Sequence, residues 1–256
     1  MTRIRMTVEY DGSRYHGFQI QQNANTVQAE LENGIKRLTG EEVSIICAGR
    51  TDSGVHALGQ VIAFDTQTSI PGDKWQFALN SFLPADIQII ESSECSPHFN
   101  PRFDALSKTY HYIIYRQNKG RIFYRNYALL NTEFLNVTAM QAACRLLQGR
   151  HNFKSFCASG SSVKTFERSV YRCNLVEEEP FLRLEIKADG FLYNMVRIIM
   201  GTLLEIGRGN YQPETVKDII DVQDRTRAGP TASPQGLYLV QVEYDTEIGV
   251  TMKLSC

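Results

Sequence analysis

Apolar and polar residues alternate with two different periods along this chain. Residues 3–10 (RIRMTVEY) alternate at every second position, which predicts a strand with one apolar face. Residues 26–40 (TVQAELENGIKRLTG) instead repeat apolar side chains at helical spacing, and Gly40 supplies a helix stop. Both kinds of element are therefore expected, beginning with a strand and then a helix.

The same two periods recur to the end of the chain. A basic, aromatic loop is expected after the strand at 107–116, and the strands at 168–178 and 180–190 are expected to form a hairpin. Further strands are predicted at 43–48, 59–66, 87–95, 107–116, 168–178, 180–190 and 236–244. Further helices are predicted at 75–83, around 138–149, at 194–209 and from 213 to 222.

This order of elements predicts an α+β fold built from two halves of similar content. The predicted halves are residues 1–104 and 105–256, with no low-complexity linker between them. We expect them to share one extended, mostly antiparallel sheet with helices packed on one side. A groove between the halves is the natural place for a substrate.

Composition narrows the class of protein. A hydrophobic content of 43% with 21% charged residues is ordinary for a globular protein. The longest apolar stretch, MVRIIMGTLLEIG, is too short to span a bilayer, and the N-terminus lacks the features of a signal peptide. The six cysteines are scattered without metal-site spacing. We therefore expect a cytoplasmic protein with reduced cysteines, no membrane association and no structural metal.

The formal net charge of −1 conceals a strong asymmetry. Between Ser96 and Arg172 there are twelve Lys/Arg and three Asp/Glu, an excess of +9, so the rest of the chain carries −10. Clustered positive charge suits a polyanion, since neutralising phosphates releases counterions. A solvated basic surface explains the same count equally well.

One carboxylate stands out for its surroundings. Asp52 lies in a polar stretch, RTDSG, between the apolar runs VSIICA and VIAF. Asp, Ser and Gly all favour turns, so a hairpin turn is one interpretation. The other is reaction chemistry, in which Arg50 forks onto Asp52 and keeps it ionised as a nucleophile or general base. Composition alone favours the turn.

Two further clusters contain residue types suited to an RNA site. Tyr110 and Tyr112 share one face of the strand KTYHYIIYR, where aromatic rings alternate with cations. Tyrosines also form strands well and could simply pack. Arg197 lies in a helix that is otherwise apolar on most sides, so it needs an acid or a ligand anion if it is buried, and Asp52 would suit. A solvent-facing stripe is the alternative for Arg197.

Hydrolase chemistry is poorly supported. An aspartic protease needs a second D-[ST]-G, and a serine hydrolase of the α/β type needs a G-x-S-x-G elbow, but the chain has neither. Phosphate-binding glycine loops are also missing from the sequence.

Five segments, in order along nearly the whole chain, resemble the TruA family of tRNA pseudouridine synthases. The most specific is AGRTDSGVHALGQVIAF around Asp52. The others are VEYDGSRYHGFQIQ, FNPRFDALSKTYHYIIY, DGFLYNMVRIIMGTLLEIGRG and AGPTASPQGLYL. Ser53 stands where the family more often has Ala, a departure expected to be neutral.

The resemblance implies a fold, an activity and roles for residues. It implies two RRM-like halves around a cleft, a homodimer, and isomerisation of uridine to pseudouridine in the tRNA anticodon stem-loop, at positions 38, 39 and 40, with no metal or nucleotide cofactor. Asp52 matches the catalytic aspartate and Tyr110 the active-site tyrosine, while Arg50 matches a basic active-site residue and Arg197 is the candidate partner of Asp52. A non-catalytic tRNA-binding or chaperone module is the alternative. The candidate RNA-binding residues are Arg102, Lys108, Arg121, Arg125, Arg150, Lys154 and Lys164.

Overall fold

The chain folds into two compact units. The computed structural model describes residues 1–160 and 163–245. The first unit contains Met1–Ser107 together with the chain from Leu239 onward, and the second is Lys108–Tyr238. The first boundary lies close to the proposed junction at 104/105, while the last strand returns to the first unit. Each unit is described below by itself.

The first unit is built on antiparallel strands. β1 (Thr2–Tyr10) pairs on one side with β3 (His56–Thr66) and on the other with β4 (Ile87–Cys95). The short β2 (Ile46–Cys47) also pairs with β3. The final strand, β10 (Leu237–Tyr244), lies beside β3 in the strand order.

Two helices cover the apolar face of these strands. α1 (Val27–Thr39) begins at Thr26, whose side chain accepts a hydrogen bond from the Ala29 N–H, and ends at Gly40 with a φ of 78°. α2 (Trp75–Asn80) contributes Trp75, whose ring packs edge-on against Phe64 of β3 at 5.2 Å. The buried residues of β1 alternate as the sequence pattern predicts, so periodicity alone identifies this core.

The second unit repeats this design with a longer hairpin. β5 (Ala105–Tyr115) pairs with β9 (Phe181–Ala188), which pairs with β8 (Glu167–Glu178), and β7 (Gly149–Asn152) forms the edge, all antiparallel. The two-residue β6 (Leu129–Leu130) runs parallel to β5. The predicted hairpin of β8 and β9 is confirmed.

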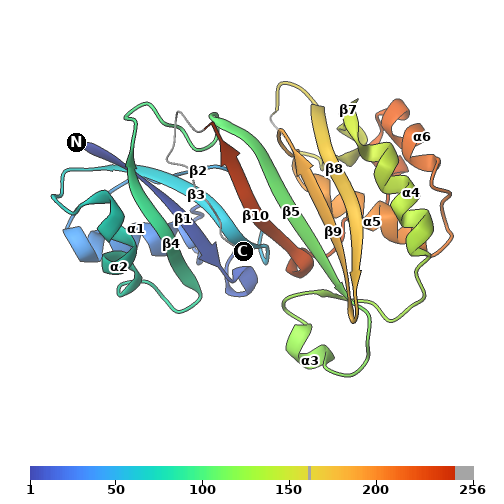
Figure 1. The fold of residues 1–256 in the computed structure, drawn as a ribbon, viewed down its shortest axis with the longest axis horizontal. Helices are drawn as coiled ribbons and strands as arrows, with labels where there is room; N and C mark the ends of the chain where they lie inside the picture. Colours follow the sequence, from blue (N-terminus) through green and yellow to red (C-terminus); the bar gives the residue numbers. More distant parts are fainter. Residues whose placement is uncertain (161–162, 246–256) are drawn as a thin grey trace. The chain divides into compact units, whose positions relative to one another are not determined.

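Four helices belong to the described part of the second unit. α4 (Val137–Leu147) packs against β8 and against α5 (Met195–Gly207) (Figure 1). α5 is buried along almost its whole length. α6 (Thr215–Val222) also contacts α4, and the four-residue α3 (Arg121–Tyr124) lies between β5 and β6. Short 3-10 turns are found at Gly12–Arg14, Gly72–Lys74, Lys154–Phe156, Arg225–Arg227 and Pro234–Gly236.

The predicted α+β class with a mostly antiparallel sheet is confirmed, and most predicted elements lie where expected. The strand predicted at 43–48 shortens to β2, and the helix expected from Pro213 begins at Thr215. β6, β7 and α3 were not predicted from the sequence. Of the six cysteines, the five in the described part form no disulfide, and Cys256 lies outside it. No helix in the described ranges is long and apolar enough to cross a membrane.

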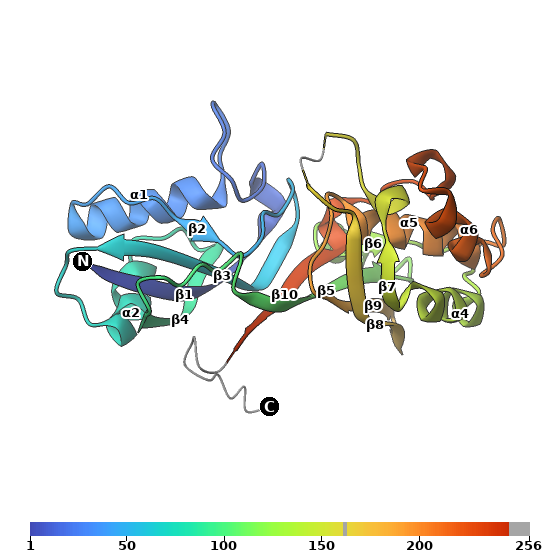
Figure 2. The ribbon, with the colours of Figure 1, turned by 90° about the horizontal axis from the view of Figure 1, so that it is seen from above.

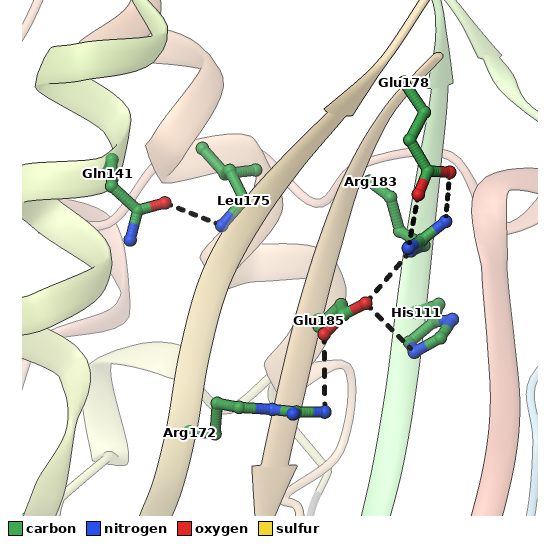
Figure 3. Close-up of polar contacts among 7 residues, drawn as sticks. All are labelled: His111, Gln141, Arg172, Leu175, Glu178, Arg183 and Glu185. Carbon is green, nitrogen blue, oxygen red and sulfur yellow. Dashed lines mark hydrogen bonds and ion pairs between the residues drawn. The ribbon is translucent and has the colours of Figure 1, made fainter.

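The sheet face of the second unit that faces away from its helices carries an ion-pair network (Figure 3). Glu185 of β9 accepts from Arg183 at 3.1 Å and lies 3.3 Å from Arg172 and 4.0 Å from the His111 ring. Arg183 also pairs with Glu178 at 2.7 Å. The Glu185 side chain is only 14% exposed, so the surrounding cations compensate for its loss of water.

This network predicts a pH dependence of stability through His111. Burial lowers the pKa of His111, and the cations Arg183 and Arg172 lower it further against the opposing effect of Glu185. The unfolded chain therefore takes up a proton near pH 6.5 that the folded chain does not yet bind. Unfolding free energy should fall as pH drops from about 7.5 through that value, and His111→Gln should lessen the fall. Urea denaturation between pH 7.5 and 5.5 measures this.

The matched control is His98→Gln, which removes a histidine from an exposed loop. That variant should keep the wild-type slope of unfolding free energy against pH. Equal slopes for wild type and His111→Gln would contradict the assignment.

Candidate functional site

The loop that carries Asp52 begins where β2 ends and finishes at the first residue of β3. The Val55 N–H donates to the Asp52 carbonyl at 3.1 Å, and Gly54 has a φ of 76°. Residues 52–55 therefore form a tight turn with Asp52 in its first position. Thr51 is buried, Asp52 is half-buried and Ser53 is exposed, so the carboxylate lies at the rim of the fold.

A buried side-chain amide fixes the start of this loop. Gln60 of β3 is fully buried, its Nε2 donates to the Gly49 carbonyl at 2.6 Å, and its Oε1 accepts from the Gly49 N–H at 3.4 Å. One residue on from Arg50, Thr51 Oγ1 lies 2.7 Å from the Tyr10 hydroxyl. Burial raises the pKa of Tyr10, which keeps that hydroxyl neutral as a hydrogen-bond partner. Both contacts hold the backbone on the N-terminal side of Asp52.

The segment after β1 closes over the other side of the loop. The Tyr15 carbonyl accepts from Ser53 Oγ at 3.2 Å and from the Gly54 N–H at 3.3 Å. The Phe18 N–H donates to the Thr51 carbonyl at 3.0 Å. The backbone on both sides of Asp52 is thus held by hydrogen bonds, which fixes the position from which its side chain projects.

Two glycines allow this close approach of backbones. A Cβ on Gly12 would lie 2.0 Å from the Val55 carbonyl oxygen, and one on Gly17 would lie 2.7 Å from the Thr51 carbonyl oxygen. Gly17 also has a φ of 94°. The Gly12 N–H donates to Nδ1 of the buried His56 at 3.1 Å, and Asp11 lies 3.2 Å from the same nitrogen. The segment that leads from these contacts to α1 projects away from the rest of the first unit (Figure 2).

Arg50 is exposed and lies two positions before the half-buried Asp52. Its neighbours Gly49 and Thr51 make the inward contacts of this part of the loop, to Gln60 and Tyr10. The fork of Arg50 onto Asp52 stays a prediction.

The second unit carries Tyr110 and Arg197. Tyr110 and Tyr112 lie on the same face of β5, opposite Ile186 and Leu184 of β9, as the alternation predicts. The Tyr110 ring is 8% exposed and packs edge-on against Phe191 at 5.0 Å. Tyr112 is fully buried and donates from its hydroxyl to the Ser233 carbonyl at 2.7 Å, so packing is its function.

Arg197 lies in the first turn of α5 and is half-buried. Its Nε donates to the Ala232 carbonyl at 2.7 Å, and its Nη1 donates to Asn194 Oδ1 at 2.8 Å. The segment 228–236 that supplies Ala232 is pressed onto α5, since a Cβ on Gly201 would lie 1.7 Å from the Pro230 carbonyl oxygen. Arg197 is therefore half-buried and hydrogen-bonded to a backbone carbonyl and to a side-chain amide, rather than lying on a solvent-facing stripe.

The predicted RNA-binding residues are mostly exposed cations. Arg102 stacks over Phe103 at 5.5 Å, Lys108 is half-buried, and Arg150 pairs with Glu167 at 2.7 Å. The others have exposed side chains: Arg121, Arg125, Lys154 and Lys164.

The residues that position Asp52 were missed by sequence reasoning. Tyr10, Tyr15 and Gln60 lie within the segments that resemble the family, but nothing in the sequence shows that they bond to the Asp52 loop. The contact of Gln60 could have been predicted, because Gln60 is a single amide in an otherwise apolar strand, GQVIAF. A buried amide requires hydrogen-bond partners, which predicts a polar contact at that point.

The chain matches known proteins over nearly its whole length. A model of the tRNA pseudouridine synthase family matches residues 6–104 and 143–245. A protein of Syntrophomonas wolfei called tRNA pseudouridine synthase A is 65% identical over 244 residues, which cover 95% of this chain and 98% of that protein. Proteins of the same name from Moorella thermoacetica and Caldicellulosiruptor bescii are each 48% identical, over 95% of this chain and 100% of theirs.

Gly17→Ala should loosen the Asp52 loop. The positive φ alone costs about 1–2 kcal/mol for a residue with a Cβ, and the clash with Thr51 pushes the two segments apart. We expect faster amide hydrogen exchange at Phe18 and Gly54, whose N–H groups bond across this contact. NMR-detected exchange measures it.

Gly40→Ala provides a matched control, because Gly40 has a φ of 78° but nothing within 4 Å of a Cβ. It should lower stability through backbone strain without changing exchange in the Asp52 loop. The same exchange rates at Gly54 in both variants would show that the contact with Thr51 does not hold the loop.

Proposed function

Because the chain belongs to the tRNA pseudouridine synthase family, we propose that it isomerises uridine to pseudouridine in the anticodon stem-loop of tRNA, at positions 38, 39 and 40. The observation that carries the proposal is the Asp52 loop. A half-buried carboxylate stands at the first position of a turn whose backbone is bonded on both sides. Such preorganisation suits a catalytic group better than a simple hairpin connection does.

The reaction requires chemistry that one carboxylate supplies. The bond between N1 and C1′ breaks, the uracil rotates, and a bond forms between C5 and C1′; C5 loses its proton and N1 gains one. A carboxylate serves this sequence by adding to C6 or to C1′, or by stabilising charge or abstracting the proton. Each of these roles needs Asp52 ionised and close to the nucleotide, and none requires an oxidant or reductant.

Tyr110 and Arg197, which both belong to the second unit, are assigned further roles in the reaction. Tyr110 is assigned to stack on the target uracil and to help move its proton, since Phe191 holds its ring in place. Arg197 is assigned as the partner of Asp52, because Ala232 and Asn194 fix the direction of its guanidinium. Arg50, exposed beside Asp52, is assigned to a substrate phosphate. The target nucleotide leaves the RNA stack to enter, which costs a few kcal/mol.

Exposed cations account for binding of the rest of the tRNA. Arg102, Lys154 and Lys164 are assigned to phosphates, as is Lys108, whereas Arg150 is partly neutralised by Glu167. The active form in this proposal is a cytoplasmic homodimer.

Asp52→Asn tests the catalytic role. It keeps the size and polarity of the side chain but removes the charge, so pseudouridine formation should fall by at least about 10³-fold, as expected for loss of a positioned catalytic group. Affinity for tRNA should change little. Pseudouridine is mapped by chemical adduct and primer extension on a tRNA transcript with uridine at positions 38, 39 and 40.

Asp73→Asn is the control, since Asp73 is an exposed carboxylate that pairs with the neighbouring Lys74 at 2.8 Å. It should retain full activity. Pseudouridine formation at the wild-type rate by pure Asp52→Asn would contradict the catalytic assignment and favour a non-catalytic tRNA-binding module. Adducts confined to sites outside the anticodon arm would overturn the substrate.

A further inference from the structure

Residues 117–127 between β5 and β6, which include α3, form a surface that the Asp52 chemistry does not use. We call them the aromatic platform; Figure 1 shows α3 beyond the ends of β5 and β9. The platform lies between the two stretches that match the family model, 6–104 and 143–245. Its role must therefore be argued from its own residues.

Aromatic contacts anchor the platform to the sheet. The rings of Tyr115, Tyr124 and Phe181 contact one another, with centroids 4.5–5.3 Å apart. The Tyr115 hydroxyl donates to the Lys119 carbonyl. At the far end, the Tyr238 hydroxyl donates to the Tyr127 carbonyl at 2.7 Å. The segment is therefore held in one conformation at both ends.

This anchoring holds two apolar side chains out into solvent. Phe123 is 73% exposed and Ile122 is 66% exposed, on adjacent positions of α3. An exposed aromatic ring on a fixed backbone loses little conformational entropy when another ring stacks on it. A stacking partner is therefore a physically reasonable occupant.

Cations surround these side chains without acidic partners. From Ala105 to Thr132 the chain has five Lys/Arg and no Asp/Glu. Lys119, Arg121 and Arg125 are exposed. Arg121 donates to the Asn118 amide oxygen, and Arg125 donates to the Ile122 backbone carbonyl. Within the described residues none of the three forms an ion pair. Their charge is available to an anionic partner.

We propose that the aromatic platform binds RNA: Phe123 stacks on an unpaired base, and Lys119, Arg121 and Arg125 contact the flanking phosphates. This inference rests on the proposed function, in which tRNA is the substrate, and it adds a second contact away from the reacting nucleotide. An aromatic ring among cations is the combination that binds unpaired nucleotides without base specificity.

A second copy of the chain is a poorer occupant. If this patch lay on the two-fold axis of a symmetric dimer it would face its own copy, so two sets of three cations would meet. Like charges brought together in this way oppose association. RNA supplies the opposite charge and a stacking surface at once.

Binding of a full-length tRNA transcript tests the proposal, with fluorescence anisotropy measured across a range of salt concentrations. Phe123→Ala should raise the Kd about tenfold with an unchanged salt dependence, because it removes stacking but no charge. The double variant Arg121→Gln/Arg125→Gln should reduce the slope of log K against log salt by about 2, since two phosphate contacts are lost. In turnover, Phe123→Ala should raise KM and leave kcat unchanged.

Phe134→Ala and Lys217→Gln are the matched controls. Phe134 is 86% exposed in the same unit, next to Glu133, and Lys217 is an exposed cation on α6. Both should bind tRNA within twofold of wild type. Equal affinities of Phe123→Ala and Phe134→Ala would overturn the proposal, as would a Phe123→Ala defect explained entirely by loss of self-association in sedimentation velocity.

The two proposals fail in different ways. If wild type forms no pseudouridine but Phe123→Ala still weakens tRNA binding, the proposed reaction is wrong. The RNA-binding role of the aromatic platform is then still supported. If wild type modifies the anticodon arm and Phe123→Ala binds like wild type, the platform alone is wrong.

Discussion

The paired hydrogen bonds between the Gln60 amide and the Gly49 backbone set where the Asp52 turn begins. A loop between two strands is free to move unless its backbone groups have fixed partners. Here the partner is a fully buried side chain of β3, so any movement of Gly49 would leave a polar group unsatisfied in the core. The position of Asp52 therefore depends on the packing of β3 as much as on its own turn.

The second unit fixes its functional side chains by a similar rule. Arg197 and Tyr112 both donate to carbonyls of one irregular segment, at Ala232 and Ser233. That segment is itself pressed onto α5, where Thr202 Oγ1 accepts from the Gly229 N–H at 2.9 Å. Side chains that bond to backbone are oriented more precisely than side chains that bond to one another, because backbone positions vary less. In both units irregular backbone, held by buried groups, surrounds the residues assigned to chemistry.

Local signals explain which parts of the fold could be predicted from sequence. α1 carries its own cap at Thr26 and its own stop at Gly40, and β1 alternates without interruption. The shortened β2 could not be foreseen, because the Ile45 N–H donates to the Glu32 side chain at 2.9 Å instead of to a strand. Similarly, i to i+3 bonds from Thr215 and Val216 make a turn after Pro213 and delay α6.

Some features of the site also follow from local sequence, whereas others depend on residues far along the chain. The motif around Asp52 identified the loop, but the contact between Thr51 and Tyr10 that helps to hold it joins residues 41 positions apart. The shared face of Tyr110 and Tyr112 followed from strand alternation alone. Which of the two tyrosines is only structural did not follow, because that depends on the Ser233 carbonyl, more than a hundred residues away.

The number of Lys and Arg residues in a stretch does not show how many of them are already in ion pairs. The basic stretch from Ser96 to Arg172 carries an excess of +9, yet several of its cations are already paired. Arg116 bonds to Glu177 and Glu179, Arg150 to Glu167, and Arg172 to Glu185. Exposed ion pairs add little stability, but they do remove positive potential from the surface. The charge open to a polyanion is therefore concentrated where the local sequence has no acid, as in the segment from Lys119 to Arg125, rather than spread over the whole basic stretch.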